Sequence, residues 1–392
     1  MKLAIIDAKI LTITGGIIES GIIVLADGKI VALGKGIEVP ADAKVIDGKG
    51  TWVTPGLIDA HSHIGLFGEP TIPATADGNE KTGPVQSYLR GIDSLNPQDP
   101  AFPQVAAAGV TTVYTGPGSS NIIGGTGMAI KLRGRTAEEM LIPGTEGMKM
   151  ALGENPKRNY AERKQIPSTR MGNAAVLREA LQKAKDYVEK IDRAIAEAPA
   201  DSAPKLPDRD LNLEMLGKVI KREQKARIHA HRADDIMTAI RIAEEFNLDY
   251  CIEHATEGYK IADILADKKV PCVVGPLLMG PAKHELWEVR LDNPAELVKA
   301  GVKVAIQVDA SSATKYLGLQ TGIAVREGLP MEEAFRCITI NAAEIIGIAD
   351  RVGSLEVGKD ADIAVFDGNP LCNFTNCLYT IIDGEIVYEV TK

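Results

Sequence analysis

The sequence predicts an α/β protein, with a barrel of alternating strands and helices in the middle and a small β module built from the two chain ends. Three observations lead to this fold class. Short apolar runs alternate with helical patterns through the middle of the chain. The stretch from His61 to Asp309 has about the 250 residues of an eight-fold (β/α)8 barrel. Asp-Gly turn signals separate strand patterns at both ends.

The two ends of the chain have similar sequence patterns. Strand patterns flank Asp27-Gly28 and Asp47-Gly48 near the start, and Asp367-Gly368 and Asp383-Gly384 near the finish. Asp-Gly between two strands is the strongest short hairpin signal. We therefore expect both ends to join in one module, with a separate sheet at each end as the competing interpretation. The expected boundaries are 1–54 and 348–392 for the module and 55–347 for the barrel.

The middle of the chain supplies the strands and helices of the barrel. The candidate strands are 56–61, 111–116, 129–132, 149–153, 226–230, 250–253, 271–275 and 303–308. The candidate helices are 174–198, 211–223 and 331–347, and the Pro- and Asp-rich stretch 198–210 is typical of a surface loop.

Composition limits the partners. Hydrophobic residues make up 45% and charged residues 25% of the chain, and the formal net charge is −9. Nucleic acid or an anionic membrane would demand a basic face, so we expect neither as a partner. We see no signal-peptide pattern and no apolar run of the ~20 residues that a membrane helix needs. We therefore expect a cytoplasmic protein that acts on a small molecule.

The first candidate metal-ligating residues lie in the stretch IDAHSHIG. Residues two apart in a strand point to one face, so His61 and His63 share a side. At the C-terminal end of a barrel strand, that side is the usual place for an active site. Two neutral imidazoles there form a metal-ligand pair. Alone the pattern is a weak signal, since any strand can carry two histidines.

Other ligand-type residues follow the same rule. They stand at the C-terminal ends of further candidate strands: Glu154, His229, His231, His254 and Asp309. Only His284, among the six histidines, lies elsewhere, where it resembles an ordinary residue at a helix start. Because chance would scatter histidines over loops and helices, the joint pattern predicts a metal site.

These motifs resemble the amidohydrolase superfamily, in its imidazolonepropionase-like and prolidase-like subgroup. The resemblance rests on TPGLIDAHSHIG, on the later His, His and Asp strand ends, on ADGKIVALGKG and on the tail ITINAAEIIGIADRVGSLEVGKDADIAVFDGNPL. It covers nearly the whole chain. It implies a (β/α)8 TIM-like barrel with a small β-sandwich domain formed from both chain termini.

The resemblance also implies metal ligands at His61, His63, His229, His254 and Asp309. Many relatives bridge two metal ions with a carboxylated lysine, and some use glutamate. We favour Glu154 as the bridge, because its rival Lys149 lies in mid-strand. His231 either replaces His229 as the ligand, contacts the substrate or packs behind the ligands. We expect two divalent metal ions per chain, Zn²⁺ first, with Mn²⁺, Co²⁺, Ni²⁺ or Fe²⁺ as alternatives.

The expected reaction is hydrolysis of an amide-type C–N bond in a cyclic amide, an N-acyl compound or a dipeptide. A metal-bound hydroxide would attack the carbonyl, and Asp309 would carry the proton to the leaving nitrogen. The alternative is a deaminase that releases ammonia from a ring, although Arg232 stands where deaminase-like relatives often have a glutamate. A third interpretation, from another class, is a non-catalytic scaffold, whose relatives lack the metal ligands.

Three features remain open on sequence alone. The stretch GPGSSNIIGGTG (116–127) lacks the Gly-Lys-Ser/Thr ending of a nucleotide-binding loop, so we interpret it as a flexible loop at the barrel mouth. Arg158 and Arg170 are candidates to bind a substrate carboxylate. Barrels of this kind commonly associate, so we expect a homo-oligomer.

Overall fold

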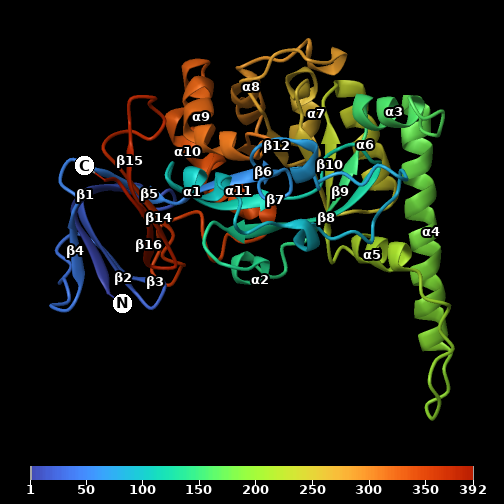
Figure 1. The fold of residues 1–392 in the computed structure, drawn as a ribbon, viewed down its shortest axis with the longest axis horizontal. Coiled ribbons are helices and arrows are strands. Elements are labelled where there is room, and N and C mark those ends of the chain that lie inside the picture. The colour runs from blue at the N-terminus through green and yellow to red at the C-terminus, as the bar shows by residue number, and fades with distance from the viewer. Residues whose placement is uncertain (1, 392) are drawn as a thin grey trace.

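The structure, a computed structural model, describes residues 2–391. Two eight-stranded sheets organise the chain (Figure 1). One belongs to a small module that holds both chain ends, and the other forms a nearly closed barrel surrounded by helices. The predicted α/β fold class, with a barrel and a module built from both termini, is confirmed.

Strands from both chain ends share the sheet of the terminal module. They are β1 (Leu3–Leu11), β2 (Ile17–Ala26), β3 (Lys29–Gly34), β4 (Lys44–Asp47), β5 (Trp52–Pro55), β14 (Ile363–Phe366), β15 (Cys377–Ile382) and β16 (Glu385–Glu389). The antiparallel pairing of β5 with β14 joins the two ends of the chain in one sheet. The module surrounds its own core, to which Ile5, Ile23 and Val53 from one end and Ile363 and Ile381 from the other contribute.

Two of the Asp-Gly pairs form hairpin turns. Asp27-Gly28 joins β2 to β3 and Asp383-Gly384 joins β15 to β16, with positive φ at all four residues. The prediction that Asp47-Gly48 forms another hairpin is wrong. β4 and β5 both pair with β1 in parallel, one after the other along the same strand. Gly48 instead donates its N–H to the Ile6 carbonyl oxygen, which turns the chain over the end of the β1–β4 ladder.

The barrel sheet contains the remaining strands, close to the predicted positions except that β8 begins six residues before the predicted 129–132. They are β6 (Leu57–Ser62), β7 (Val110–Thr115), β8 (Ile123–Lys131), β9 (Gly147–Ala151), β10 (Lys225–Ala230), β11 (Tyr250–His254), β12 (Cys272–Val274) and β13 (Val304–Ile306). Parallel pairing links β6 to β7 and every neighbour from β9 to β13. The C-terminal ends of these strands therefore meet at one mouth.

One strand departs from the regular (β/α)8 pattern. β8 runs antiparallel to both β7 and β9. The connection from β7 to β8 is only residues 116–122, whereas a parallel crossover needs about a dozen residues or more. Close approach of glycines permits this sharp return, because a Cβ on Gly127 would lie 2.8 Å from the Thr115 carbonyl oxygen. Residues 123–127 of the loop expected at 116–127 are thus strand.

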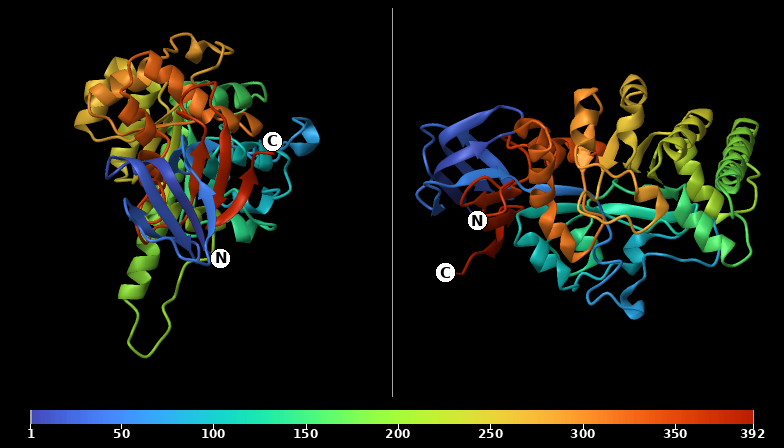
Figure 2. Two further views of the ribbon diagram at one scale, coloured as in Figure 1. Left: turned by 90° about the vertical axis from the view of Figure 1, so that its left-hand side faces the viewer. Right: turned by 90° about the horizontal axis from the view of Figure 1, so that it is seen from above.

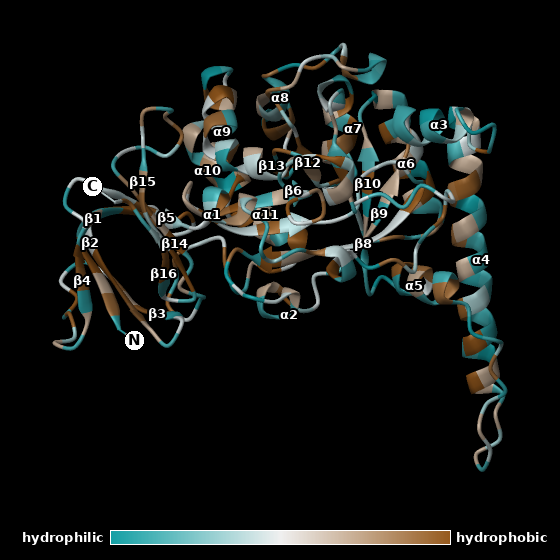
Figure 3. Ribbon diagram, viewed as in Figure 1, coloured by the Kyte–Doolittle hydropathy of each residue, from teal (hydrophilic) through white to brown (hydrophobic). Residues whose placement is uncertain are grey.

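The barrel closes at the seam between β13 and β6. Backbone hydrogen bonds cross it just beyond the strands, from Asp309 to His61 (3.4 Å) and from His63 to Ala310 (3.1 Å). At the inner core, apolar residues of the strands pack with α11 (Ile340–Ile346). In Figure 3 the hydrophobic colour gathers on the strands of both sheets, while most connecting loops are hydrophilic.

The other helices lie around the barrel. They are α1 (Ala101–Ala106), α2 (Ala137–Met140), α3 (Glu154–Ala161), α4 (Arg170–Ala196), α5 (Leu211–Ile220), α6 (Ala233–Glu245), α7 (Ala262–Asp267), α8 (Asn293–Lys299), α9 (Leu317–Arg326) and α10 (Met331–Cys337). The far end of α4 and the loop after it project beyond the barrel (Figure 2). None of the helices within residues 2–391 is both long and apolar enough to cross a membrane.

The helix predicted over 331–347 is broken in two. α10 ends at Cys337 and α11 begins at Ile340. Between them the Ile338 carbonyl oxygen accepts the N–H of Ile58 at the start of β6 (2.8 Å), and the Thr339 hydroxyl donates to the Phe335 carbonyl oxygen. Contacts to the barrel therefore replace the hydrogen bonds that a continuous helix would make.

A buried ionic cluster joins the terminal module to the barrel. The Lys131 ammonium, at the end of β8, donates to Asp360 (2.8 Å), Asp362 (3.1 Å) and Asp383. Asp360 also pairs with Lys29 (2.6 Å) and Arg351 (2.7 Å). The Lys131, Asp360 and Asp362 side chains are almost completely buried. The cluster fixes one lysine of the barrel to three carboxylates that follow the barrel in sequence.

Candidate metal centre

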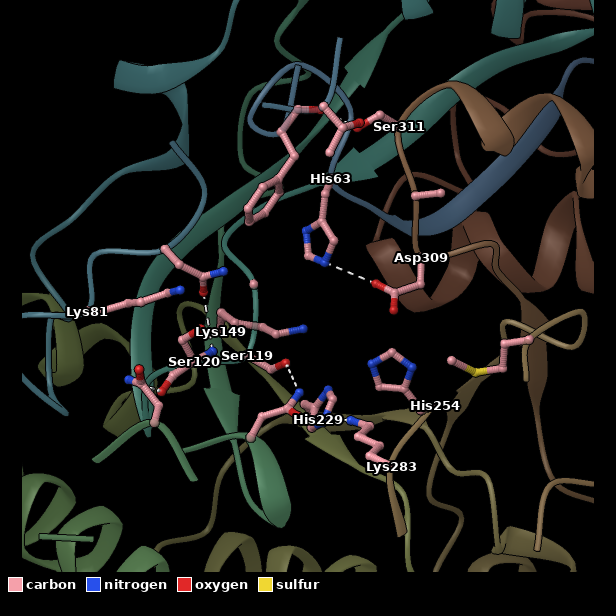
Figure 4. Close-up of a pocket in the computed structure, with 18 of the residues that line it drawn as sticks. His63, Lys81, Ser119, Ser120, Lys149, His229, His254, Lys283, Asp309 and Ser311 are labelled. Carbon is pink, nitrogen blue, oxygen red and sulfur yellow. Dashed lines mark hydrogen bonds and ion pairs between the residues drawn. The ribbon is translucent and has the colours of Figure 1, made fainter. Parts of the chain in front are cut away.

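Two groups of potential metal ligands lie at the mouth of the barrel. One group is His61, His63 and Asp309, and the other is His229, His231 and His254; within each group the ligand atoms lie within 4.8 Å of one another. The His61 and His254 rings, whose centroids are 5.1 Å apart, connect the two groups. Figure 4 shows His63, His229, His254 and Asp309 around one cavity. The fold thus brings together the histidines and the aspartate that the sequence placed at different strand ends.

His61 and His63 direct the same ring nitrogen toward Asp309. The Asp309 Oδ1 lies 3.1 Å from the His61 Nε2 and 3.0 Å from the His63 Nε2. The Nδ1 of His63 donates to the Gly116 carbonyl oxygen (2.7 Å), and the Nδ1 of His61 lies 2.9 Å from Glu253 Oε1. Because these outer partners hold the Nδ1 side, both rings offer Nε2 to the mouth.

Backbone conformation turns two of these side chains inward. His254 (φ 72°), the last residue of β11, and Asp309 (φ 55°), three residues beyond β13, both adopt the left-handed region. For residues other than glycine this conformation costs about 1–3 kcal/mol each, and it persists only where the surroundings enforce it. Such strain at two candidate ligands is typical of a functional site.

His229 carries the clearest mark of a missing partner. The side chain is buried, and neither Nδ1 nor Nε2 has a hydrogen-bond partner within residues 2–391. Burial and the neighbouring His254 hold the pKa of His229 well below its usual value, and burial lowers the pKa of His254 to about 3. Both rings are therefore neutral, the form that binds a metal ion. A divalent cation fits these residues, since it would satisfy an otherwise unpaired buried nitrogen.

His231 differs from His229 in having both nitrogens engaged. Its Nε2 lies 3.1 Å from the Lys283 Nζ, and its Nδ1 lies 2.7 Å from the Thr256 hydroxyl. An ammonium group only donates, so Nε2 accepts and the ring proton resides on Nδ1. Of the two histidines that the sequence left as alternatives, His229 is the one with a free lone pair.

The structure does not bring Glu154 into either group. β9 ends at Ala151, and Gly153 (φ 91°) turns the chain into α3, whose first residue is Glu154. The Glu154 side chain lines a neighbouring pocket, with its carboxylate 3.8 Å from Arg158. Lys149, which the sequence argument disfavoured because it is in mid-strand, is instead buried and faces the cavity among the ligands (Figure 4).

A buried charged network behind the ligands escaped the sequence analysis. Glu253, on β11, contacts His61, Lys149 and Arg227. Although burial raises the pKa of Glu253, these three neighbours hold it well below its usual value, so the carboxylate is ionised. Arg227 also lies against the Tyr114 ring, 3.6 Å from its centroid. The signal was present in the sequence, since Arg227 and Glu253 are charges inside apolar strands beside the predicted ligands.

All of the potential ligands except His61 line the floor of a cavity of about 670 Å³. Its walls are mostly polar and include Lys81, Ser119, Ser120, Asn155, Arg158 and Lys283. Arg158 therefore lies where a substrate could meet it. Arg170 does not, because its guanidinium binds the buried Asp235 (3.0 Å) and lines the neighbouring pocket. A cavity of this size holds one small molecule.

Comparisons with known proteins agree with this architecture. The model of the Amidohydrolase family matches residues 52–387. Amidohydrolase tasK of Hapsidospora irregularis is 29% identical over 95% of this chain, which spans only 40% of that relative's length. The imidazolonepropionase of Maricaulis maris is 26% identical, over 90% of this chain and 88% of that protein.

Solved structures extend the comparison. A crystal structure of an amidohydrolase from Thermotoga maritima MSB8 is 42% identical, with a TM-score of 0.94 over 99% of this chain and 100% of that one. A prolidase complexed with N-methylphosphonate-L-proline, at 18% identity and a TM-score of 0.58, shares the fold alone.

Proposed function

Because the chain belongs to the amidohydrolase family, we propose that it is a metal-dependent hydrolase that cleaves an amide-type C–N bond in a cyclic amide, an N-acyl compound or a dipeptide. The observation that carries this proposal is His229, whose two buried nitrogens lack any partner within residues 2–391 while His63, His254 and Asp309 line the same cavity. A structural histidine would have at least one of these nitrogens hydrogen-bonded.

The proposed ligands fall into two sets. His61, His63 and Asp309 would hold one divalent ion, and His229 and His254 a second, with zinc the first choice for nitrogen and oxygen ligands. When bound, such ions lower the pKa of water to roughly 7 and polarise a carbonyl group.

Lys149 is the proposed bridging ligand in place of Glu154, because it faces both sets of ligands (Figure 4). An ammonium group has no lone pair, so this role requires carboxylation. The neutral Nζ would form an N–C bond to carbon dioxide and release one proton. The resulting carbamate would supply two oxygen ligands.

Asp309 is the proposed proton carrier. Although burial raises its pKa, the His61 and His63 rings beside the carboxylate hold it well below the usual value. The carboxylate is therefore ionised and can accept the proton of the attacking water, then return it to the leaving nitrogen. With Asp309→Asn we expect most of the bound metal to remain and most of kcat to be lost.

The two alternatives find less support. Arg232, which stands where deaminase-like relatives often have a glutamate, pairs with Asp234 (2.9 Å) at the start of α6. It is not among the residues that line the cavity. A scaffold without metal has no need of two groups of potential ligands at one mouth, nor of the strained backbone at His254 and Asp309.

A product assay tests the proposed function. The metal-loaded protein would be incubated with lactams, N-acyl amino acids, dipeptides and aminated rings, and new amine with carboxylate scored separately from free ammonia. We expect amine and carboxylate, and we expect them to disappear with Asp309→Asn. Ammonia from a ring would establish the deaminase instead, and a protein that takes up no zinc would restore the scaffold interpretation.

A further inference from the structure

One wall of the cavity has no part in the proposed metal chemistry. It consists of the loop after β7, with Ser119 and Ser120, and of Lys81 from the long connection between β6 and α1. In Figure 4 these three residues lie together on the side of the cavity away from Asp309. The serines belong to the glycine-rich stretch 116–127, for which the sequence offered no role beyond a flexible loop.

Hydrogen bonds hold this wall in place. The Gly118 N–H donates to the Gly78 carbonyl oxygen (2.9 Å), and the Ser120 N–H donates to the Asn79 side chain (3.2 Å). A Cβ on Gly118 would lie 2.5 Å from the Asn79 side-chain amide, so a larger residue here would displace the amide that bonds Ser120. The loop after β7 and the segment that carries Lys81 are thus fastened together.

Asn121 provides a second connection between the loop after β7 and the segment that carries Lys81. Its buried side-chain amide donates to the carbonyl oxygens of Glu80 (2.6 Å) and Gly83 (2.7 Å), on either side of Lys81. Arg163 donates to the carbonyl oxygen of Lys81 itself. The backbone around Lys81 is therefore preorganised, although it belongs to no helix or strand.

The wall offers hydrogen-bond donors to the cavity. The Ser119 hydroxyl accepts a hydrogen bond from Asn155 (2.8 Å), which leaves its own proton free to donate. The backbone groups of Ser120 are both engaged, with Asn79 and Asn159, whereas its hydroxyl has no hydrogen-bond partner among residues 2–391. The Lys81 ammonium extends toward the cavity and forms no ion pair within residues 2–391 (Figure 4).

Apart from Glu162, the other charged groups at the cavity have partners, and the cations Arg158 and Lys149 contact Glu154 (3.8 Å) and Glu253 respectively. Lys283 pairs with the buried Glu285 carboxylate (2.6 Å). Glu69 accepts a hydrogen bond from Ser312 (2.5 Å), and Asp309 contacts His61 and His63. Glu162, the remaining carboxylate of the lining, forms no ion pair with Lys81. An unpaired ammonium group on an ordered backbone, beside two hydroxyl donors, is suited to bind an anion.

We propose that this wall binds a carboxylate group of the substrate. This inference rests on the proposed function and narrows it, because the amide that is cleaved would carry a carboxylate, as an N-acyl amino acid or a dipeptide does. Neutral lactams and other uncharged amides would leave Lys81 without its partner. The wall would also orient the substrate, since the carboxylate lies at one side of the cavity and the metal ligands form its floor.

Paired substrates test the inference. Each N-acyl amino acid and dipeptide would be assayed beside its methyl ester, with release of the amine at the scissile bond as the readout. For the wild type, we expect kcat/KM to be about 10- to 100-fold higher for the acids, as a charged hydrogen bond of about 1.5–3 kcal/mol requires. Lys81→Met should raise KM for the acids by a similar factor, change kcat by less than about threefold and bring the acid-to-ester ratio close to one.

The control variant is Lys157→Met, which removes a lysine of α3 that lines the neighbouring pocket and not this cavity. It should leave both substrate series unchanged. Lys81→Glu should reverse the preference, so that esters become the better substrates. Because Lys81 is exposed and is no metal ligand, these variants should retain the wild-type fold and metal content, which circular dichroism and metal analysis check.

The outcomes separate the two proposals. Equal kcat/KM for acids and esters in the wild type, or an equal loss for both in Lys81→Met, would overturn the carboxylate wall and leave amide hydrolysis standing. Cleavage of no amide by metal-loaded protein would overturn the proposed function and this inference with it.

Discussion

The Nδ1 of His61 lies 2.9 Å from the Oε1 of Glu253, and both side chains are buried behind the mouth of the barrel. Glu253 also contacts Lys149 and Arg227. Glu253 belongs to no metal-ligand motif. Its carboxylate nevertheless orients both His61, a candidate metal ligand, and Lys149, the candidate bridging residue.

Glu253→Gln should weaken metal binding. The amide keeps the shape of the side chain, but it lacks the charge that fixes His61, and changes of this kind cost about 10- to 100-fold in metal affinity. Competition with a chelator measures this affinity. Glu257→Gln is the matched control, because Glu257 bonds the Ala233 N–H and Lys260 rather than a ligand. Equal affinity in both variants would remove the orienting role of Glu253.

The two histidines of β10 and its end should behave differently. His229→Ala removes the ring with two unpaired nitrogens, so we expect the metal content to fall from about two ions per chain to about one. His231→Ala removes a ring that already bonds Thr256 and Lys283, and the metal content should stay near that of the wild type. Metal analysis after dialysis distinguishes them, and the reverse result would make His231 the ligand.

Lys149→Ala and Glu154→Ala decide which residue bridges. We expect metal loss in Lys149→Ala, because the side chain is buried among the ligands. Glu154→Ala should keep its metal, since its carboxylate lies in the neighbouring pocket beside Arg158. Mass spectrometry of the native protein should also detect the added carbon dioxide on Lys149. Metal loss in Glu154→Ala alone would restore the sequence-based prediction.

Lys131→Met should destabilise the protein strongly. It leaves the carboxylates of Asp360, Asp362 and Asp383 facing one another without their shared cation, and breaking a buried ion pair costs about 3–5 kcal/mol. Lys29→Met is the control, because the Lys29 side chain is 49% exposed although it pairs with the same Asp360. It should cost about 1 kcal/mol or less. Urea unfolding compares the two, and equal costs would refute the role of burial.

The same cluster predicts a pH dependence. Burial raises the pKa of Asp362 from 3.8 to about 6. Between these values the folded state binds a proton that the unfolded state has lost, so the free energy of unfolding should fall as pH rises from about 4 to 6, by at most about 1.4 kcal/mol per pH unit. Urea unfolding of wild type and Asp362→Asn across this range isolates the effect. A difference between them that does not vary with pH would count against it.

Much of the architecture was readable because apolar runs mark strands whatever their partners. β6, β10 and β11 lie within a residue or two of their predicted positions. The direction of a strand is harder to predict than its position. The β8 sequence indicates a strand, but only the short connection from β7 decides that this strand runs antiparallel. Asp47-Gly48 likewise indicates a turn, but tertiary contacts decide that β4 and β5, on either side of it, both pair with β1.

The candidate site likewise contains residues that could be predicted from the sequence and residues that could not. His61, His63, His254 and Asp309 could be predicted because the C-terminal ends of parallel strands meet at one mouth. Glu154 could not be placed, because its direction depends on the positive φ of Gly153. Lys149 faces the cavity from mid-strand, which only the completed barrel makes visible. Glu253 and Arg227 form an ion pair between the neighbouring strands β11 and β10. Such a pairing between strands cannot be read from a local sequence pattern.

The pairing of β5 with β14 has a consequence for how the protein is made. The first strand of this pair is synthesised roughly 300 residues before its partner, so it leaves the ribosome with one edge unpaired. The barrel between them can begin to assemble during translation, whereas the module must wait for the last part of the chain. The C-terminal strands therefore act as the closing step of biosynthesis, and a prematurely terminated chain would carry an exposed, aggregation-prone edge in place of a finished domain.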